Sequence, residues 1–288
     1  MKVFAPFAEI FLLKTIWSFK VLLSGGPFSR TQFLCRGLFS GALRYWRVLE
    51  FAYILDRLPK QEKLKILDIS SPKILSFYLA RKHEQRVTAI DIWGEEIVFW
   101  KEILKRIDGK GNMAANINLL IEDATCLSLE NESFDCVYSV SSIEHFDDSG
   151  DTKALREISR VLKKGGIAVI TVPYDENGHE VFKGEDVYHK KFTSEPVFYE
   201  RWYDKDLLQE RLLRDSGLEL IDFRLGFEKY ICLHHKIITK SYKLPYPIRI
   251  LWNAIDPFIG LINLRATLKL NTRKEGVALL TLSKPKQS

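Results

Sequence analysis

The chain has 288 residues, of which 46% are hydrophobic and 28% are charged, so it can build a sizeable core without disulfide staples. This length allows one large α/β domain with appendages or two small domains. The four cysteines are scattered, with no close-spaced pair and no histidine at metal-ligand spacing. We therefore expect reduced thiols, a cytoplasmic protein and no metal site.

Positive charge is concentrated in two segments, although the whole chain carries a formal charge of only +6. Residues 1–60 hold nine Lys and Arg against three acids, and residues 228–274 hold nine against two, so the remainder is net acidic. This asymmetry predicts an anionic partner for the two segments, such as a lipid headgroup or a phosphorylated substrate. The alternative is that they are solvated helix faces. Nucleic acid is disfavoured, because no nucleic-acid-binding module is present.

The first 24 residues are rich in large apolar side chains but are interrupted by charges. No uncharged run approaches the roughly 20 residues of a spanning helix, and the pattern does not fit a signal peptide. Leu12, Ile16, Phe19 and Leu23 share one face of an amphipathic helix. That face either docks on the core or lies in a membrane interface, which would make the protein peripheral on the inner membrane face.

Apolar runs and helical patterns alternate along the rest of the chain. Strands are predicted at 66–69, 87–90, 117–121, 134–140, 167–172, 218–227 and 277–282, and helices include 151–162 and 204–216. This order predicts an α/β fold with a doubly wound, seven-stranded, mostly parallel sheet. We assign residues 1–60 to a helical extension and 61–288 to the main domain. Two long insertions interrupt that domain, a lid at 174–203 and a basic amphipathic, helical insertion at 228–274.

Two acids end neighbouring predicted strands. Asp68 closes the first strand and Asp91 closes the second. Ligands of doubly wound sheets bind outside the carboxyl ends of the strands. An acid about 20 residues beyond the first turn is placed to accept hydrogen bonds from ribose hydroxyls. The pair therefore predicts a nucleotide-containing ligand.

Two further stretches of sequence narrow the identity of that ligand. Residues 134–146 read FDCVYSVSSIEHF, and residues 157–166 read EISRVLKKGG. Together they resemble class I S-adenosylmethionine-dependent methyltransferases of the small-molecule branch called type 11, over about 62–227 plus the last strand. The resemblance implies a Rossmann-like fold with a reversed last strand, S-adenosyl-L-methionine as cofactor, and methyl transfer.

The resemblance also implies which residues contact the cofactor. It implies that Asp68 and Ser70 belong to the first loop and that Asp91 meets the ribose, with Ile92 as a further cofactor contact. Asp123, with Ala124 beside it, should meet the adenine edge, and Ser141 should line the methionine end.

The first loop departs from the family pattern, which usually reads acid-x-Gly-x-Gly-x-Gly. Ser70, Pro72 and Ile74 hold the glycine positions here. Glycine permits positive φ and close approach of the backbone to a ligand, whereas proline fixes φ and lacks an N–H. We expect a different loop path, a shifted cofactor or weak binding. A non-catalytic binding or scaffold protein on the same fold is the alternative. A nicotinamide oxidoreductase is disfavoured by the missing Gly-x-Gly-x-x-Gly.

Methyl transfer is an in-line displacement that depends on positioning and desolvation, and a hydroxyl acceptor also needs a base. His145, after the fourth strand, either shapes the pocket or acts as that base. Tyr174, Asp175, His179 and His189 on the first insertion are further candidates. The aromatic and arginine stretch 198–203 suits an acceptor wall. We expect a small-molecule or lipid-linked acceptor, saccharides included; no oligomeric state is predicted.

Overall fold

The computed structural model describes residues 4–41, 43–109, 111–186, 191–230, 232–233, 240, 243–268 and 275–286. Parts of the basic insertion and His189 lie outside these ranges. Within them, no helix combines the length and apolar character needed to cross a membrane.

Helices precede and flank the strands in the order that the sequence predicts. The helices are α1 (Phe4–Leu23), α2 (Phe28–Gly41), α3 (Arg47–Arg57), α4 (Ile74–Lys82), α5 (Gly94–Ile107), α6 (Gly150–Val161), α7 (Lys205–Leu207), the π-helical turn η3 (Leu208–Leu213) and α8 (Tyr246–Asn263). The strands are β1 (Lys65–Ile69), β2 (Arg86–Asp91), β3 (Ile117–Ile121), β4 (Phe134–Val140), β5 (Leu162–Asp175), β6 (His179–Asp186), β7 (Lys191–Trp202), β8 (Glu219–Glu228), β9 (Leu264–Thr267) and β10 (Glu275–Ser283). Short 3-10 turns, η1 (Ala114–Asn116) and η2 (Ile143–His145), complete the described elements.

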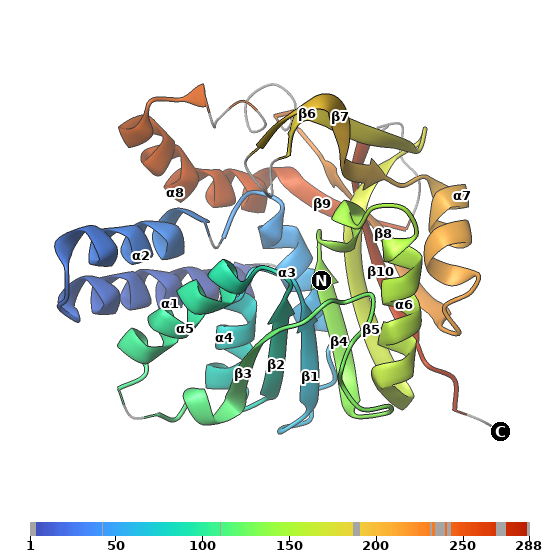
Figure 1. The fold of residues 1–288 in the computed structure, drawn as a ribbon, viewed down its shortest axis with the longest axis horizontal. Helices are drawn as coiled ribbons and strands as arrows, with labels where there is room; N and C mark the ends of the chain where they lie inside the picture. Colours follow the sequence, from blue (N-terminus) through green and yellow to red (C-terminus); the bar gives the residue numbers. More distant parts are fainter. Residues whose placement is uncertain are drawn as a thin grey trace.

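The main sheet has the strand order β3-β2-β1-β4-β5-β10-β8-β9 (Figure 1). β1 to β5 run parallel, and β10 inserts antiparallel between β5 and β8. The prediction of a doubly wound, mostly parallel sheet with a reversed last strand is therefore confirmed. An eighth strand, β9, extends the edge by pairing with β8.

Three local expectations were incomplete. The 174–203 insertion is largely a two-stranded antiparallel hairpin of β6 and β7, outside the main sheet. The strand predicted to stop before Pro173 continues to Asp175, because β4 has already ended on that side and no ladder bond to it is lost. The helix predicted over 204–216 is divided into α7 and the π-helical turn η3.

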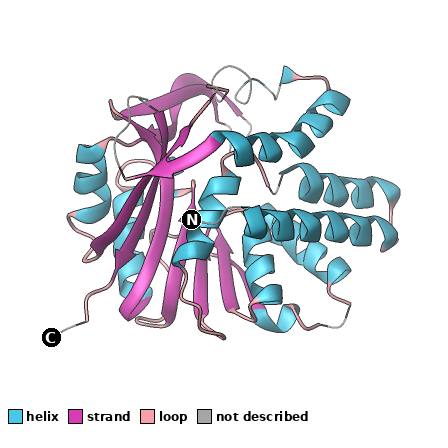
Figure 2. Ribbon diagram, turned by 180° about the vertical axis from the view of Figure 1, so that it is seen from behind, coloured by secondary structure: helices cyan, strands magenta, loops and turns pink. Residues whose placement is uncertain are grey.

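The N-terminal helices belong to the same apolar core as the sheet. One core cluster joins side chains of α1 to α3 with those of α4, α5 and one sheet face. Trp17 of α1 meets Phe77 of α4 edge-on, with ring centroids 6.0 Å apart, and Phe77 meets Trp100 of α5 at 5.3 Å. Figure 2 shows α1, α2 and α8 gathered on the side of the molecule opposite α6 and α7. The 1–60 extension therefore packs as part of the main body.

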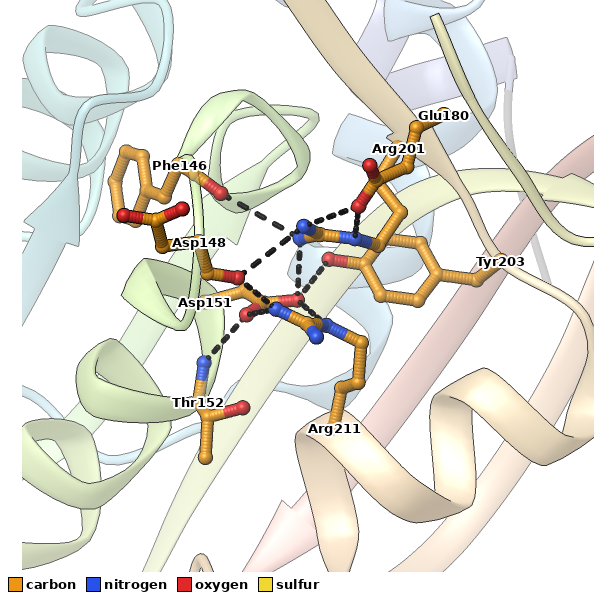
Figure 3. A network of polar contacts seen from close by, with 8 residues as sticks. All are labelled: Phe146, Asp148, Asp151, Thr152, Glu180, Arg201, Tyr203 and Arg211. Carbon is orange, nitrogen blue, oxygen red and sulfur yellow. Dashed lines mark hydrogen bonds and ion pairs between the residues drawn. The ribbon is translucent and has the colours of Figure 1, made fainter. Parts of the chain in front are cut away.

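A cluster of polar groups, the Asp151 cluster, fastens the β6–β7 hairpin to α6 (Figure 3). The buried Asp151 carboxylate accepts hydrogen bonds from Arg201 and Tyr203, both at 2.8 Å, and from Arg211 at 2.7 and 2.8 Å. Arg201 is only 2% exposed and also donates to Glu180. Because charge-assisted bonds in a buried site are strong, this cluster fixes the hairpin over the carboxyl end of the sheet.

We expect Asp151→Asn to lower the free energy of unfolding by about 3 kcal/mol, because it leaves a buried guanidinium undercompensated. Urea denaturation measures the change. The matched control is Asp215→Asn, which breaks an exposed 3.1 Å pair with Arg156 and should cost less than about 1 kcal/mol. Equal losses in the two variants would contradict the role of the Asp151 cluster.

Charged groups are also buried where α8 meets the N-terminal helices. Arg44 donates to Asp256 of α8 at 2.7 Å. Lys14 of α1 is fully buried, and its Nζ makes no hydrogen bond within the described residues but lies over the rings of Phe11 and Phe39. Burial lowers the pKa of Lys14 to about 8, an effect that Asp256 opposes. Burial raises the pKa of Asp256 to about 6, which Arg44 opposes.

We expect Lys14→Met to stabilise the protein by about 2 kcal/mol at pH 7, because it removes a desolvated ammonium. Between pH 8 and 10.5 the unfolded chain holds this proton more tightly than the folded chain. Wild-type stability should therefore rise with pH across that window, and the advantage of the Lys14→Met variant should shrink. Thermal unfolding over this range tests both. Lys20→Met, an exposed position on α1, is the control: it retains Lys14, so its stability should rise with pH as that of the wild type does.

Candidate active site

A cleft of about 1070 Å³ opens at the carboxyl ends of β1, β2 and β4. Its floor is the loop after β1, and one wall is the start of α5 with Asp91 before it. The roof comes from α2, through Arg30, Phe33 and Gly37, and Arg47 of α3 closes one end. Because doubly wound sheets bind ligands at this edge, this cleft is the candidate active site.

The loop after β1 holds its path without glycine. Ser70 adopts φ +51°, the left-handed conformation that glycine adopts freely and serine adopts at a cost of about 1 kcal/mol. Its N–H donates to the Ile90 carbonyl at 3.0 Å, which fixes the turn against β2. Ser70, Ser71 and Pro72 all line the cleft. The loop therefore keeps the positive φ expected of glycine at its first glycine position.

A buried ammonium organises this loop. Lys73, at the start of α4, is fully buried and donates to the carbonyls of Ser71 and Ile90, both at 2.9 Å. Its Nζ also lies 3.6 Å from Asp68 Oδ2 and 3.9 Å from Asp91 Oδ2. The ammonium therefore joins the loop backbone to the acids that end β1 and β2. We refer to Lys73, Asp68 and Asp91 as the Lys73 cluster.

The two acids of the cluster have different surroundings. Asp68 is fully buried; its Oδ1 accepts from the Ser71 N–H at 3.0 Å, and its Oδ2 accepts from the Ser76 hydroxyl. Asp91 lines the cleft, and its Oδ1 accepts from the Trp93 N–H at 3.0 Å. Burial raises the pKa of Asp91, and the nearby Lys73 ammonium opposes that rise. Asp68 thus supports the loop, whereas Asp91 faces the cleft.

The remaining predicted cofactor contacts lie outside the cleft lining. Ile92 is exposed beside Asp91. Asp123 Oδ1 accepts from the backbone N–H and the hydroxyl of Thr125, at 2.8 and 2.7 Å. Ala124 is buried. None of these three is among the residues that line the cleft, so Ser70, Asp91 and Ser141 are the members of the predicted set that the cleft brings together.

The end of β4 is held by a residue that the sequence did not single out. Ser141 takes φ +42°, and its hydroxyl donates to Glu50 Oε1. The same oxygen accepts from the Thr171 hydroxyl at 2.7 Å, while Glu50 Oε2 pairs with Arg47 at 2.5 Å. Glu50 is fully buried. The N-terminal extension therefore supplies a carboxylate and a guanidinium beside the cleft. The only sequence signal for this role is that charged and apolar residues are interspersed in the segment.

His145 lies in η2 after β4. Its Nδ1 is 2.7 Å from the carbonyl oxygen of Tyr199, which is an acceptor, so Nδ1 carries the proton and Nε2 is the acceptor nitrogen. Burial lowers the pKa of His145, which keeps the ring neutral at pH 7. Burial also raises the pKa of the neighbouring Glu144 carboxyl far above its ordinary value, and Glu144 Oε2 has no hydrogen-bond partner in the part of the chain that the structure describes.

The other catalytic candidates lie elsewhere. Tyr174 is buried at the end of β5, in the core cluster on the sheet face that α6 covers. His179 begins β6, stacks on Trp202 and contacts the Asn177 carbonyl at 2.9 Å. Asp175 Oδ1 accepts from the Asn177 N–H at 2.8 Å. None of the three lines the cleft.

We expect Lys73→Met to lower the free energy of unfolding by about 3 kcal/mol, because it leaves two buried carboxylates without their cation. The loss should be larger at pH 7 than at low pH, because burial raises the pKa of Asp91 and protonation of its carboxyl relieves the repulsion. Chemical denaturation at the two pH values measures it. Lys82→Met, at the exposed end of α4 and 3.6 Å from Glu9, should change stability by less than about 1 kcal/mol.

Comparisons with known proteins agree with this geometry. Residues 67–170 match the family model for a methyltransferase domain. Haemonchus contortus phosphoethanolamine N-methyltransferase 2, in complex with S-adenosyl-L-methionine, is 16% identical with a TM-score of 0.54, over 93% of this chain and 60% of that chain. A SAM-dependent methyltransferase from Methanosarcina mazei is 19% identical with a TM-score of 0.50, over 81% and 97%.

The [4+2]-cyclase SpnF shares the fold as well, at 18% identity and a TM-score of 0.55, over 93% of each chain. At such identities a structural likeness establishes the fold, and the family model supplies the assignment. The matched segment includes the end of β1, Asp91, and the end of β4, where Val140 and Ser141 line the cleft. Residues 67–170 are therefore similar to a methyltransferase domain, and the fold is that of S-adenosylmethionine-dependent methyltransferases.

Proposed function

We propose that the chain transfers a methyl group from S-adenosylmethionine, held in the cleft, to a small-molecule or lipid-linked acceptor. The observation that carries this proposal is the convergence of Ser70, Asp91 and Ser141 on one cleft at the carboxyl ends of the parallel strands. The left-handed Ser70 keeps the loop in a shape that admits a ligand to its backbone. The residues present therefore fit the cofactor.

Each of these residues has a distinct task in the proposed complex. Asp91 accepts hydrogen bonds from the ribose hydroxyls, the loop at Ser70 faces the methionine portion, and Ser141 borders the methyl group. When bound, the cofactor supplies a methyl group on a sulfonium sulfur, which keeps the bonding electron pair as the acceptor takes the methyl. The protein contributes orientation and exclusion of water.

We assign His145 the task of taking the acceptor's proton where the acceptor is a hydroxyl. The hydrogen bond from Nδ1 to Tyr199 leaves Nε2 able to accept a proton, and the lowered pKa keeps His145 neutral at pH 7. A purely structural role, in which His145 anchors the hairpin at Tyr199, is the alternative. His145, like Tyr174 and His179, is not among the residues that line the cleft, but it lies only four residues beyond Ser141, which does. Tyr174 and His179 therefore stay secondary candidates.

The proposal also covers the kind of methyl acceptor and the place in the cell where the protein meets it. We place the protein in the cytoplasm, with a lipid-linked acceptor, saccharides included, reached from an anionic membrane surface. The net positive charge of residues 1–60 and 228–274 supports this setting.

A second candidate function is that of a ligand-binding or scaffold protein that keeps the fold but does not transfer methyl groups. Two observations favour it: the glycine positions held by Ser70 and Pro72, and the structural likeness to a protein named as a [4+2]-cyclase. Cofactor binding without turnover of any acceptor would favour this candidate.

We expect calorimetry to detect binding of S-adenosylmethionine by the wild-type chain, and Asp91→Asn to weaken it about tenfold, because a charged hydrogen-bond acceptor is lost. The control Asp215→Asn removes a remote, exposed carboxylate and should leave the affinity unchanged. Absence of binding at millimolar cofactor, in a protein whose circular dichroism shows that it is folded, would overturn the proposal.

A further inference from the structure

Helix α1 carries an apolar stripe that the core does not cover. Leu12, Ile16, Phe19 and Leu23 follow one another at helical spacing, and their exposed fractions run from 42% to 83%. The opposite face is buried and mostly apolar, with two polar side chains, Lys14 and Ser18, among Phe7, Ile10, Trp17 and Val21. The stripe expected from the sequence is therefore present, and it faces outward instead of docking on the core.

Helix α8 repeats this arrangement. Its outward stripe consists of Ile248, Leu251, Ile255, Phe258 and Ile262, spaced three and four residues apart and between 41% and 65% exposed. Its inward face buries the polar side chains of Asn253, Asp256 and Asn263. This reverses the usual pattern of water-soluble helices, which place apolar residues inward and polar residues outward, whereas α1 carries apolar residues on both faces.

Helices α1 and α8 meet through one member of the α8 stripe. Phe258 of the α8 stripe contacts Phe7 and Phe11 of α1, with ring centroids 5.2 and 4.8 Å apart. Figure 2 shows α1 and α8 on the same side of the molecule. Outward-facing aliphatic and aromatic side chains on two adjoining helices form a patch of a kind that marks an interaction surface.

The partner that covers this patch must tolerate the positive charge of the surrounding chain segments. The segments that carry the stripes, residues 1–60 and 228–274, each hold a large excess of Lys and Arg. A second copy of the chain would bring like charges together and be repelled. A bilayer with anionic headgroups offers both an apolar interior for the stripes and a negative surface for the flanking cations.

We propose that α1 and α8 together form a membrane-docking surface, in which both helices lie in the interface of an anionic bilayer with their apolar stripes inserted. We call the nine stripe residues the docking stripes.

This docking deepens the proposed function but is measurable without it. Helix α2, which packs beside α1, contributes the roof of the cleft through Arg30, Phe33 and Gly37. Docking through α1 would therefore bring the cleft roof close to the bilayer surface. An acceptor anchored by a lipid tail could then reach the cleft while its tail stays in the membrane.

Vesicle sedimentation of the full chain tests the surface. We expect binding to phosphatidylcholine vesicles that contain phosphatidylglycerol, weaker binding to pure phosphatidylcholine, and weakening by salt. The paired variants Phe19→Ser/Leu23→Ser on α1 and Leu251→Ser/Ile255→Ser on α8 should each lower the partition coefficient at least about tenfold. The control pair Leu220→Ser/Ile221→Ser replaces exposed apolar residues of β8 and should bind as the wild type does.

Two companion measurements make the outcome decisive. Thermal unfolding and cofactor calorimetry should be unchanged in the stripe variants, because these residues lie outside the cleft and the core. A wild-type chain that stays in the supernatant with anionic vesicles would overturn the proposal, whatever its activity. Equal loss in the β8 control pair would overturn it too, as would light scattering that shows a dimer which the stripe variants dissociate.

Discussion

The Lys73 ammonium between Asp68 and Asp91 is the constraint on which the binding edge depends. A buried ammonium and two buried carboxylates are each costly to remove from water, and only their proximity and their hydrogen bonds offset that cost. Because Lys73 also binds the carbonyls of Ser71 and Ile90, it ties the ends of two parallel strands to the loop between them. In this chain a charged side chain thus helps to fix a loop whose glycine positions hold other residues.

The contacts of Lys73 explain how a loop without the family's glycines can still border a cleft. Ser70 takes the left-handed conformation at a modest cost, which the surrounding contacts can sustain. Pro72 lies where no β-ladder partner is required, directly before the helix that Lys73 begins. Neither change removes Asp91 from the cleft. Ser70 therefore keeps a positive φ at a glycine position, while a different loop path, a shifted cofactor and weak binding stay predictions.

The sequence predicted the sheet well because buried parallel strands are short, continuous apolar runs; β3 and β4 begin and end where their runs do. It predicted the hairpin of β6 and β7 poorly, since those strands are polar and lie outside the main sheet. Within the site, Asp91 and Ser141 follow strands and were found by position. Glu50 and Lys73 were missed, because their roles arise from contacts with residues that lie up to 121 positions away and from burial, which a local pattern does not report.

The N-terminal helices connect these observations. α3 supplies Glu50 and Arg47 to the end of β4, α2 supplies the cleft roof, and α1 carries an outward apolar stripe. Both α1 and α8 expose an apolar stripe, and α8 in addition buries Asn253, Asp256 and Asn263; exposing such stripes to water is unfavourable, which is the basis of the docking that we propose. The extension therefore borders the cleft through α2 and α3. Because α1 packs against α2, the proposed contact of α1 with a bilayer would also bring the cleft close to that bilayer.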